Sequence, residues 1–529
     1  MERKLLGIGL GMVVILGATS AFLLSGGEPP TDPTATSQQA PPIQPAPPAE
    51  HGPPDRDREA VLAALRRLDA CALLDVDYAK SRRNPDAVAI PSGPHACALL
   101  TDPKWTPAYP GESRISLAVG VENGSDHRFL QKPVVVGGAK AYEISGESGR
   151  DCVLDLPVSH TFSIELRMDR SSGTNACEFV EDYGARAVAK LANPDTFSVD
   201  TAKRPFSAWD GCAFVAKLFG QNLTGYTLAP DGTEDPFSGC RATSREQTRA
   251  GLKAGYDKWR PNRGDRLTRI GDKDAIVRDG GNCDVLWHQG PSGSANEWFG
   301  SLIFDLVAED CATATRLAAE AIQLAGQAPE SGAVQPQRPL LYGPDENDTG
   351  KVGACVDLIN SDCSPYRGGI TVPPTFEAAA NASRVNQAVQ CEAFQEAVKA
   401  AYGETLAPVT WGTHCMFVEP THTLLVYVDI DGQNRPAEYG TGSSNWIDRQ
   451  VKQVGGKQAV TFRTADGAEY DVYYSPYNEI SRRGNLHLHL QAYPPRGVRY
   501  ENAVPLDPVR TELAERVVAL VDRKYFGSR

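Results

Sequence analysis

The stretch VGGAKAYEISGESGRDCVLDL, residues 136–156, is repeated in outline twice further along the chain. The related stretches are IGDKDAIVRDGGNCDVLW, residues 270–287, and VGGKQAVTFRTADGAEYDVYY, residues 454–474. Each contains an apolar residue, Gly, then Gly or Asp, two variable positions, Ala, an apolar or aromatic residue and, a short turn later, a strand-like run. Glycine permits the positive φ angles of tight hairpin turns. The three copies therefore predict one β-hairpin in each of three repeated units.

The same order of elements surrounds each hairpin. A helix comes first, followed by strands with alternating apolar residues, the hairpin, one more strand and a final helix. Helices beside a mostly antiparallel sheet make an α+β unit. The first helices are expected at residues 58–74, 206–219 and 385–402, and the final helices at residues 178–191, 312–324 and 509–521. The predicted α+β units span residues 57–195, 203–326 and 351–527, and a linker spans residues 327–350.

The cysteines fall in register with these units. Units one and two each have four, on the first helix, the next strand, the hairpin strand and the start of the final helix, whereas unit three has only the first two. Four cysteines allow three pairings. Only the pairing of first with second and third with fourth lets unit three lose its later pair without leaving a free thiol. The predicted disulfides are Cys71–Cys97, Cys152–Cys177, Cys212–Cys240, Cys283–Cys311 and Cys391–Cys415.

Two further cysteines, Cys355 and Cys363, are close enough in sequence to close a small loop of their own. Zinc sites usually use closer pairs such as C-x2-C, and this nearest pair is eight positions apart. An even number of cysteines with no orphan is typical of an oxidising, extracytoplasmic space. Each of the five longer bridges should stabilise its unit by roughly 3–4 kcal/mol in the chain-entropy model.

Arg3 and Lys4 precede an uncharged apolar run at residues 5–24. A helix of about 20 apolar residues matches the hydrocarbon core of a bilayer, and its positive flank stays cytoplasmic. We therefore expect a cytoplasmic stub at residues 1–4 and an uncleaved, single-pass anchor in the plasma membrane at residues 5–25, with the bulk of the chain extracytoplasmic. A cleavable signal peptide is the alternative, because small residues cluster towards the end of this run, although the apolar region of a signal peptide is usually about 7–15 residues long.

Residues 26–56 are rich in proline, which favours extended polyproline II geometry and predicts a semi-rigid stalk. The net charge of the chain is −13. Nucleic acid is therefore not expected as a partner, because phosphate contacts need a concentrated Lys and Arg surface. The expected partners are the membrane, through residues 5–25, and a cell-wall component or another envelope protein.

The repeated unit resembles the secreted cysteine-containing lipoprotein domains of actinobacteria, whose function is unassigned. The features that carry this resemblance are the Cys on the first helix, the C-x-L-like strand, the VGG-x-x-A hairpin and the Cys at the final helix. The layout is also similar to the extracellular sensor domains of some actinobacterial receptor serine/threonine kinases. The resemblance implies a domain outside the membrane that binds a small molecule, a cell-wall fragment or a protein. The chain departs from the lipoproteins by its expected helix anchor, and from the kinases because only residues 1–4 precede that anchor.

The sequence contains no G-x-S-x-G, H-E-x-x-H, Gly-rich phosphate or EF-hand motif. His487 and His489 in NLHLHLQ are the best chemical candidates, because residues two apart on a strand share a face. They are weak candidates for a metal site with His422, since their alternation with leucines is fully explained by two solvent-facing polar residues. Asp429 and Asp431 are candidates for calcium binding, although acidic turns are usually only solvated. We therefore expect no metal and no cofactor.

The sequence thus predicts a non-catalytic, membrane-anchored binding or sensing protein of a bacterial cell envelope. We expect no catalytic residues, and the sequence does not identify the binding residues. A structural link between membrane and cell wall is the first alternative, and an envelope hydrolase with His487 and His489 in its site is the second. A deep pocket between units would favour binding, a catalytic cluster the hydrolase, and broad polar surfaces the link.

Overall fold

The computed structural model describes residues 54–82, 85–100, 114–146, 149–169, 175–231, 235–244, 249–262, 265–280, 282–329, 334–349, 363–411, 414–418, 423–441, 445–494, 496–497 and 504–527. The expected anchor, nearly all of the expected stalk, Cys355 and His422 lie outside these residues, and so does the expected Cys355–Cys363 pair. None of the helices in the described part of the chain combines the length and the apolar character needed to cross a membrane.

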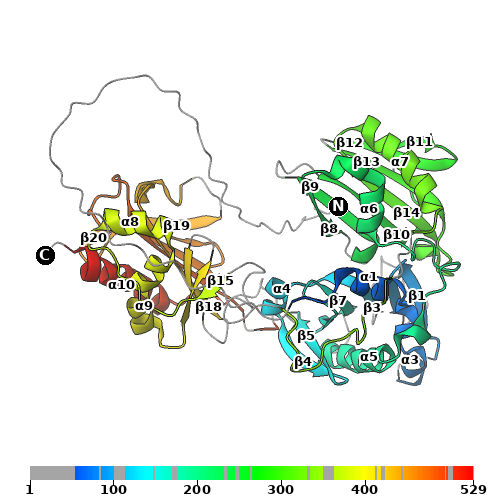
Figure 1. Ribbon diagram of the computed structural model, residues 1–529, viewed down its shortest axis with the longest axis horizontal. Coiled ribbons are helices and arrows are strands. Elements are labelled where there is room, and N and C mark those ends of the chain that lie inside the picture. The colour runs from blue at the N-terminus through cyan, green and yellow to red at the C-terminus, as the bar shows by residue number, and fades with distance from the viewer. Residues whose placement is uncertain are drawn as a thin grey trace, which may run out of the picture. The chain divides into compact units, whose positions relative to one another are not determined.

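Three α+β units follow one another along the chain, coloured blue to cyan, green, and yellow to red in Figure 1. Each unit contains one antiparallel sheet with helices packed on it, so this part of the fold prediction is confirmed. The helices of unit one are α1 (Arg58–Arg66), α2 (Ala70–Leu73), α3 (Val76–Arg82), α4 (Ser125–Leu130), α5 (Ala176–Leu191) and the 3-10 turn η1 (Pro194–Phe197). Its strands are β1 (Val88–Gly93), β2 (Ala96–Leu100), β3 (Arg114–Glu122), β4 (Lys132–Val136), β5 (Ala139–Ser145), β6 (Cys152–Pro157) and β7 (Phe162–Asp169).

Units two and three repeat this plan. Unit two has helices α6 (Gly211–Phe219) and α7 (Cys311–Ala325), and the 3-10 turns η2 (Gly220–Leu223), η3 (Pro236–Ser238) and η4 (Glu297–Phe299). Its strands are β8 (Tyr226–Pro230), β9 (Gly239–Ser244), β10 (Arg249–Asp257), β11 (Arg266–Ile270), β12 (Lys273–Gly280), β13 (Asn282–Pro291) and β14 (Ser301–Ala308). Unit three has helices α8 (Phe376–Val385), α9 (Ala388–Tyr402) and α10 (Pro508–Val521), the 3-10 turn η6 (Pro436–Glu438) and the π-helical turn η8 (Asp522–Phe526). Its strands are β15 (Cys363–Pro365), β16 (Ala407–Trp411), β17 (His414–Val418), β18 (Leu424–Asp431), β19 (Trp446–Val454), β20 (Lys457–Thr464), β21 (Glu469–Tyr474) and β22 (Asn485–Ala492).

The three sheets share one strand order. Sheet one runs β1-β2-β3-β7-β6-β5-β4, sheet two runs β8-β9-β10-β14-β13-β12-β11, and sheet three runs β16-β17-β18-β22-β21-β20-β19 with β15 added beside β16. In each sheet the last strand returns to the middle, between the third and the sixth of the seven. The repeat inferred from the quoted phrase is therefore a repeat of topology.

The quoted phrase forms the hairpin turn between the fourth and fifth strands, as predicted. Gly137 and Gly138 have φ angles of 59° and 86°, and Gly455 and Gly456 of unit three have 58° and 92°. The first glycine also touches the final helix, because a Cβ at Gly137 would lie 3.0 Å from Val188 Cβ on α5. Glycine therefore serves both the turn and the close approach of the helix.

Replacing Gly137 by alanine is expected to lower the free energy of unfolding by about 2–4 kcal/mol, from left-handed strain and from overpacking against α5. Gly138→Ala is the matched control. Its φ is also positive, but nothing lies within 4 Å of the added Cβ, so only the strain of about 1–2 kcal/mol is expected. Denaturant unfolding measures both variants, and equal losses would show that the contact with α5 contributes nothing.

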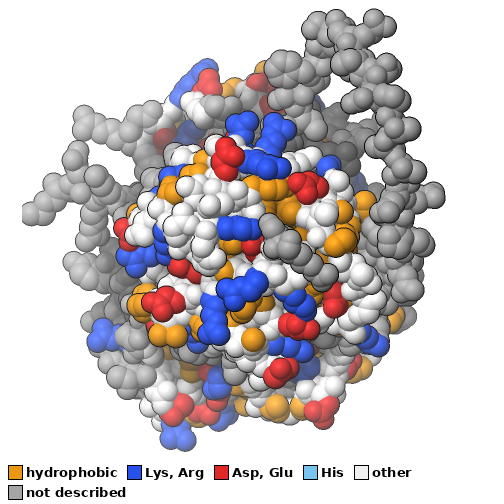
Figure 2. Space-filling model, turned by 90° about the vertical axis from the view of Figure 1, so that its left-hand side faces the viewer, with side chains coloured by type: hydrophobic (Ala, Val, Ile, Leu, Met, Phe, Trp, Pro, Cys, Tyr) orange, Lys and Arg blue, Asp and Glu red, His pale blue; other side chains and the backbone are white. Residues whose placement is uncertain are grey.

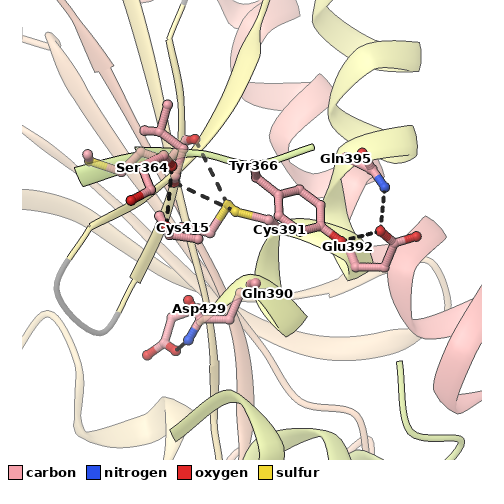
Figure 3. The surroundings of a disulfide bond; sticks show 12 residues. Ser364, Tyr366, Gln390, Cys391, Glu392, Gln395, Cys415 and Asp429 are labelled. Atoms are coloured by element: carbon pink, nitrogen blue, oxygen red, sulfur yellow. Dashed lines mark hydrogen bonds between the residues drawn. A yellow bond between two sulfur atoms is a disulfide. The ribbon is translucent and has the colours of Figure 1, made fainter. Parts of the chain in front are cut away.

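In the described part of the chain five disulfides join helices to strands, and their pairing is the predicted one. They link α2 to β2 (Cys71–Cys97), α5 to β6 (Cys152–Cys177), α6 to β9 (Cys212–Cys240), α7 to β13 (Cys283–Cys311) and α9 to β17 (Cys391–Cys415). Figure 3 shows the last of these, with the hydroxyl of Tyr366 donating to Glu392 of α9 at 2.5 Å. The bridge and this hydrogen bond hold α9 against the β15–β17 edge of sheet three.

A tyrosine replaces the missing bridge of unit three. Strand register places Tyr470 of β21 at the position that Cys152 has in β6 and Cys283 has in β13. The Tyr470 hydroxyl donates to Glu515 Oε1 of α10 at 2.6 Å, and Lys452 Nζ lies 2.5 Å from the same oxygen. Hydrogen bonds therefore tie the final helix to the sheet in unit three, where units one and two use a disulfide.

The first helix of unit one is shorter than predicted. The expected helix at residues 58–74 is divided into α1 and α2, because Asp69 interrupts it and caps α2 by accepting a hydrogen bond from Cys71 N at 2.9 Å. A carboxylate at this position satisfies a backbone N–H that the helix leaves unpaired. Asp210 caps α6 in the same way in unit two.

The hydrophobic cores of units one and two interlock. Phe237, from η3 of unit two, lies in the core of unit one and is 3% exposed. Gly120 of β3 has a φ of 75°, and a Cβ there would come within 2.4 Å of the Phe237 ring. In the opposite direction, Ile90, Ala98 and Leu100 of sheet one lie in the core of unit two. Neither of these two cores is complete without the other unit.

Two ion pairs reinforce this contact between units one and two. Arg66 of α1 lies 2.5 Å from Asp210, and Arg204 lies 3.0 Å from Asp69. Each aspartate caps the cysteine-bearing helix of its own unit. The two pairs are therefore reciprocal, because each unit supplies one arginine and one capping carboxylate.

A fully buried histidine lies in the same contact. The backbone N–H of His95 donates to Asp235 Oδ2 at 2.7 Å, and its ring Nε2 lies 3.0 Å from the carbonyl oxygen of Ser207. Since a carbonyl only accepts, Nε2 carries the proton, and Ser238 Oγ, 2.8 Å away, donates to Nδ1. Burial lowers the pKa of His95 to about 3, and burial raises the pKa of Asp235 to about 7.

The expected linker at residues 327–350 packs onto unit one where it is described. The guanidinium of Arg56 lies 3.6 Å from the centroid of the Tyr342 ring. Buried Asp348 lies 3.0 Å from Arg128 Nη1 and 3.1 Å from Lys140 Nζ. Ion pairs and a cation–π contact therefore hold this segment against unit one.

Candidate binding face on the third sheet

The two faces of sheet three differ in character. Leu486, Leu488 and Leu490 of β22 are fully buried in the core beneath α8, α9 and α10. Because side chains alternate along a strand, His487 and His489 lie on the opposite face, called the outer face here. The shared face predicted for the two histidines is therefore present.

A carboxylate joins these two histidines. Asp471 of β21 lies 2.7 Å from His487 Nε2 through Oδ1 and 3.1 Å from His489 Nδ1 through Oδ2. The carboxylate is almost fully buried, with 4% of its side chain exposed, whereas 14% of the His487 and 19% of the His489 side chain is exposed. Both oxygens of Asp471 are thus engaged by imidazole nitrogens.

Charge is stabilised within this cluster. Burial alone would raise the pKa of Asp471, but His489 and His487 outweigh it and hold the pKa of this carboxyl below its usual range. Burial alone would lower the pKa of His489, but the charge of Asp471 and its hydrogen bond outweigh it and raise that pKa. An ionised carboxylate beside a readily protonated imidazole follows from this arrangement.

A continuous row of rings crosses the outer face through all seven repeated strands of sheet three. Neighbouring ring centroids along it are separated by 6.3, 4.7, 5.7, 4.1, 5.7 and 4.9 Å. Spacings of this size are those of interacting aromatic pairs. The members of this ring row are, in order, Trp411, His414, Tyr427, His487, Tyr473, Phe462 and Trp446.

The ring row is covered unevenly. Phe462 and Tyr473 are 3% and 8% exposed, and Tyr439 from the segment after η6 stacks on Tyr473 at 3.7 Å. Tyr427 and His487, at the middle, are half-buried. At the middle of the row, the half-buried rings of Tyr427 and His487 therefore lie beside the half-buried imidazole of His489, with the almost fully buried carboxylate of Asp471 behind the two histidines.

The remaining predicted candidates do not form a metal site within the described residues. One group of three His, Cys, Asp or Glu side chains there has its ligand atoms within 4.8 Å of one another, and it comprises Glu143, Cys152 and Cys177. The two sulfurs of that group are joined in a disulfide. Asp431 is engaged by its own turn, because it accepts hydrogen bonds from Gln433 N at 2.7 Å and from Asn434 Nδ2 at 2.8 Å.

A cavity between units one and two is too small for a ligand. Its walls include Leu62 and Phe162 of unit one and Asp210 and Phe237 of unit two, and its volume is about 10 Å³. A cavity of this size holds no more than about one water molecule. The ring row, rather than this contact, is therefore the candidate site.

Two members of this site can be recognised in the amino-acid sequence, and the others cannot. His487 and His489 were found by strand alternation, whereas Asp471, Tyr427 and Tyr473 were not. An aromatic residue at same-face positions of successive strands is a usable signal, but only once the strand order is known. Comparison with known protein families, with curated proteins and with solved structures finds no match to this chain.

Proposed function

We propose that this protein is a non-catalytic, extracytoplasmic binding protein of a bacterial cell envelope, held at the plasma membrane by the expected anchor at residues 5–25. Its ligand in this proposal is a cell-wall glycan, which contacts the ring row of sheet three. The observation that carries the proposal is the ring row with the His487–Asp471–His489 cluster at its centre.

The cysteine chemistry supports the compartment. Every cysteine whose partner lies in the described residues is paired, and the five bridges each join a helix to a sheet. Disulfides of this kind form and persist in oxidising compartments outside the cytoplasm. A reducing cytoplasm would leave all three sheets without these links.

The chemistry of the ring row supports a glycan. The C–H faces of sugars pack on aromatic rings, and imidazole and carboxylate groups hydrogen-bond sugar hydroxyls, so a binding site for sugars combines an apolar platform with a few polar groups. Figure 2 shows one face of the molecule on which acidic and basic side chains are interspersed, with hydrophobic side chains between them. No single sign of charge dominates the face seen in this view.

The pairing within the histidine cluster favours binding over hydrolysis. A general base needs a free acceptor within reach of the proton that it removes. Both oxygens of Asp471 already accept from His487 and His489. The cluster therefore serves better as a preorganised polar contact than as a proton acceptor.

Tyr427→Ala tests the proposal with the full-length protein in detergent and soluble peptidoglycan fragments as the probe. Loss of one ring contact is expected to weaken binding about tenfold, which corresponds to about 1.4 kcal/mol. Trp259→Ala is the matched control, because this half-buried ring stacks on His288 of unit two at 6.1 Å, away from sheet three. Calorimetric titration measures affinity, and thermal unfolding checks that both variants are folded.

Equal affinity of the two variants, or no binding of the fragments by the unaltered protein, would contradict this function. The structural-link alternative remains a second candidate, because the cavity between units one and two is only about 10 Å³. Sedimentation of the protein with intact peptidoglycan, without any affinity for the soluble fragments, would favour that link.

A further inference from the structure

The Cys152–Cys177 bridge has one buried and one more accessible sulfur. Cys152 of β6 is fully buried, whereas Cys177 is half-buried in the first turn of α5, just after its N-cap residue Asn175. The N-terminus of a helix stabilises a thiolate, because the unpaired N–H groups there favour negative charge. The bridge therefore presents Cys177 as the sulfur that an incoming thiolate can reach.

An acidic pair lies beside this bridge. A carboxylate oxygen of Glu143, on β5, lies within 4.8 Å of both sulfurs. The Glu143 side chain is 9% exposed, and its Oε1 lies 3.4 Å from Lys132 Nζ. Its buried Oε2 accepts from no nitrogen and from no Ser, Thr or Tyr hydroxyl. Glu181, half-buried on α5, shares a carboxyl–carboxylate hydrogen bond with Glu143.

The acidic pair is not a requirement of the fold. In unit two the Cys283–Cys311 bridge occupies the same place, with Cys283 buried and Cys311 half-buried in the first turn of α7. Alignment on strand register and on the helix cysteine places Val277 and Thr315 where unit one has the two glutamates. Among the described residues no acidic group lies as close to the sulfurs of unit two.

Unit three shows that the bridge itself is dispensable, because Tyr470 replaces it with a hydrogen bond to α10. The equivalent bridge of unit two has no such carboxyl pair beside it, and unit three has no such bridge. The fold therefore does not require the carboxyl pair of unit one. Buried carboxyls without a full set of donors are costly. Their presence points to chemistry at the sulfurs.

We propose that Cys152–Cys177 is a redox-active disulfide that exchanges with dithiols of the cell envelope, and that the Glu143–Glu181 pair donates the proton that its leaving thiolate requires. One thiolate of the dithiol attacks Cys177 Sγ. A bond forms between these sulfurs, the Cys152–Cys177 bond breaks, and its electron pair leaves on Cys152 Sγ. The acidic pair protonates that thiolate, through one water or a small side-chain rotation.

The second thiol of the dithiol then attacks the sulfur that is bonded to Cys177. Cys177 leaves as a thiolate and takes a proton from solvent. The dithiol is oxidised to a disulfide, the bridge is reduced to two thiols, and two electrons have moved. The acidic pair regains its proton through Glu181, which is partly exposed.

The pair holds a proton in mildly acidic solution. The hydrogen bond to Glu143 raises the pKa of Glu181 to about 7, with burial and the charges of Glu143 and Glu178 acting in the same direction and Lys132 of β4 opposing them. Because the pKa is raised, the proton is present below about pH 7 and is lost as the pH rises through that value. The assistance to reduction is therefore expected to disappear in mild alkali.

The test compares the two equivalent bridges within one molecule. The folded full-length protein is treated briefly with dithiothreitol at pH values from 6 to 8.5, and reduced cysteines are quantified by differential alkylation and mass spectrometry. The ratio of the reduction rates of Cys152–Cys177 and Cys283–Cys311 cancels the pH dependence of the reagent, because both bridges meet the same thiolate. We expect this ratio to fall about tenfold between pH 6 and 8.5. A general acid with a pKa of about 7 goes from roughly nine-tenths to roughly one-thirtieth protonated over this range, which limits the fall to about thirtyfold.

Glu181→Gln is expected to abolish the pH dependence of the ratio, because an amide hydrogen-bonds but does not transfer a proton. Glu178→Gln is the matched control on the same helix, since it removes a nearby charge and leaves the acidic pair intact, and its ratio should still fall with pH. A ratio that is constant with pH in the unaltered protein, or unchanged by Glu181→Gln, would overturn the proposal and leave the bridge purely structural.

Discussion

Replacing Phe237 by alanine is expected to destabilise units one and two together and to lower the free energy of unfolding by about 3–5 kcal/mol. The ring belongs to η3 of unit two, yet it is 3% exposed within the core of unit one. It packs edge-on against His95 at 4.7 Å and lies over Gly120. Its loss therefore leaves a cavity in one unit through a change in the other.

Hydrogen exchange measured by mass spectrometry distinguishes this coupling from a local effect. In Phe237→Ala, amides of β3 in unit one should exchange faster, although the substitution lies in unit two. Phe417→Ala is the control, because Phe417 is fully buried in the core of unit three, and it should leave exchange in β3 unchanged. Faster exchange confined to unit two in the first variant would contradict the interlocked cores.

In Asp235→Asn the free energy of unfolding of units one and two is expected to fall as the pH is lowered. In His95→Gln it is expected to rise as the pH is lowered. Burial lowers the pKa of His95 from 6.5 to about 3, so the stability linked to it is present above pH 6.5 and is lost as the pH falls towards 3. Burial raises the pKa of Asp235 from 3.8 to about 7, so the stability linked to it is present below pH 3.8 and is lost as the pH rises through 7.

Between about pH 4 and 6.5 these two dependences oppose each other. The unfolded chain carries one proton on the histidine, and the folded chain carries one on the aspartate, so no net proton is taken up by this pair on folding. Each proton of imbalance changes the free energy of unfolding by about 1.4 kcal/mol per pH unit. Removing Asp235 leaves the histidine dependence alone, and a loss of about 3 kcal/mol is expected between pH 6 and pH 4.

Denaturant unfolding at several pH values measures these slopes, and the slope rather than the absolute stability is the readout. Arg66 and Arg204 also face this cluster and further lower the pKa of His95, and they are present in both variants. Relative to the unaltered protein, the free energy of unfolding should decrease as the pH is lowered for Asp235→Asn. It should increase as the pH is lowered for His95→Gln. Parallel profiles for all three proteins would show that the buried pair does not titrate as described.

Local patterns were sufficient for the architecture of each unit. The glycines of the quoted phrase need positive φ wherever the chain folds, and the strand alternation around His487 and His489 sets their shared face without knowledge of any neighbour. The disulfide pairing followed from counting, because unit three lacks two cysteines together. Strand register then places Tyr470 at the position of the missing cysteine.

Contacts between distant segments were beyond such patterns. Apolar spacing predicts that Phe237 is buried but does not say in which unit, and neither Glu143 nor Glu181 has a local signature that brings it to a disulfide. Asp471 reaches both histidines only because the antiparallel pairing of β21 with β22 sets His489 opposite it.

The amino-acid sequence by itself determined the repeated α+β unit, its hairpin turn and its cysteine pairs, because backbone φ preferences, side-chain periodicity and thiol number act over short stretches of chain. The tertiary structure alone decided the interlocked cores, the ring row and the acidic pair. The ring row depends on strand order, since the last strand of sheet three returns to its middle. The interlocked cores and the acidic pair depend instead on how η3 and α5 pack against sheet one.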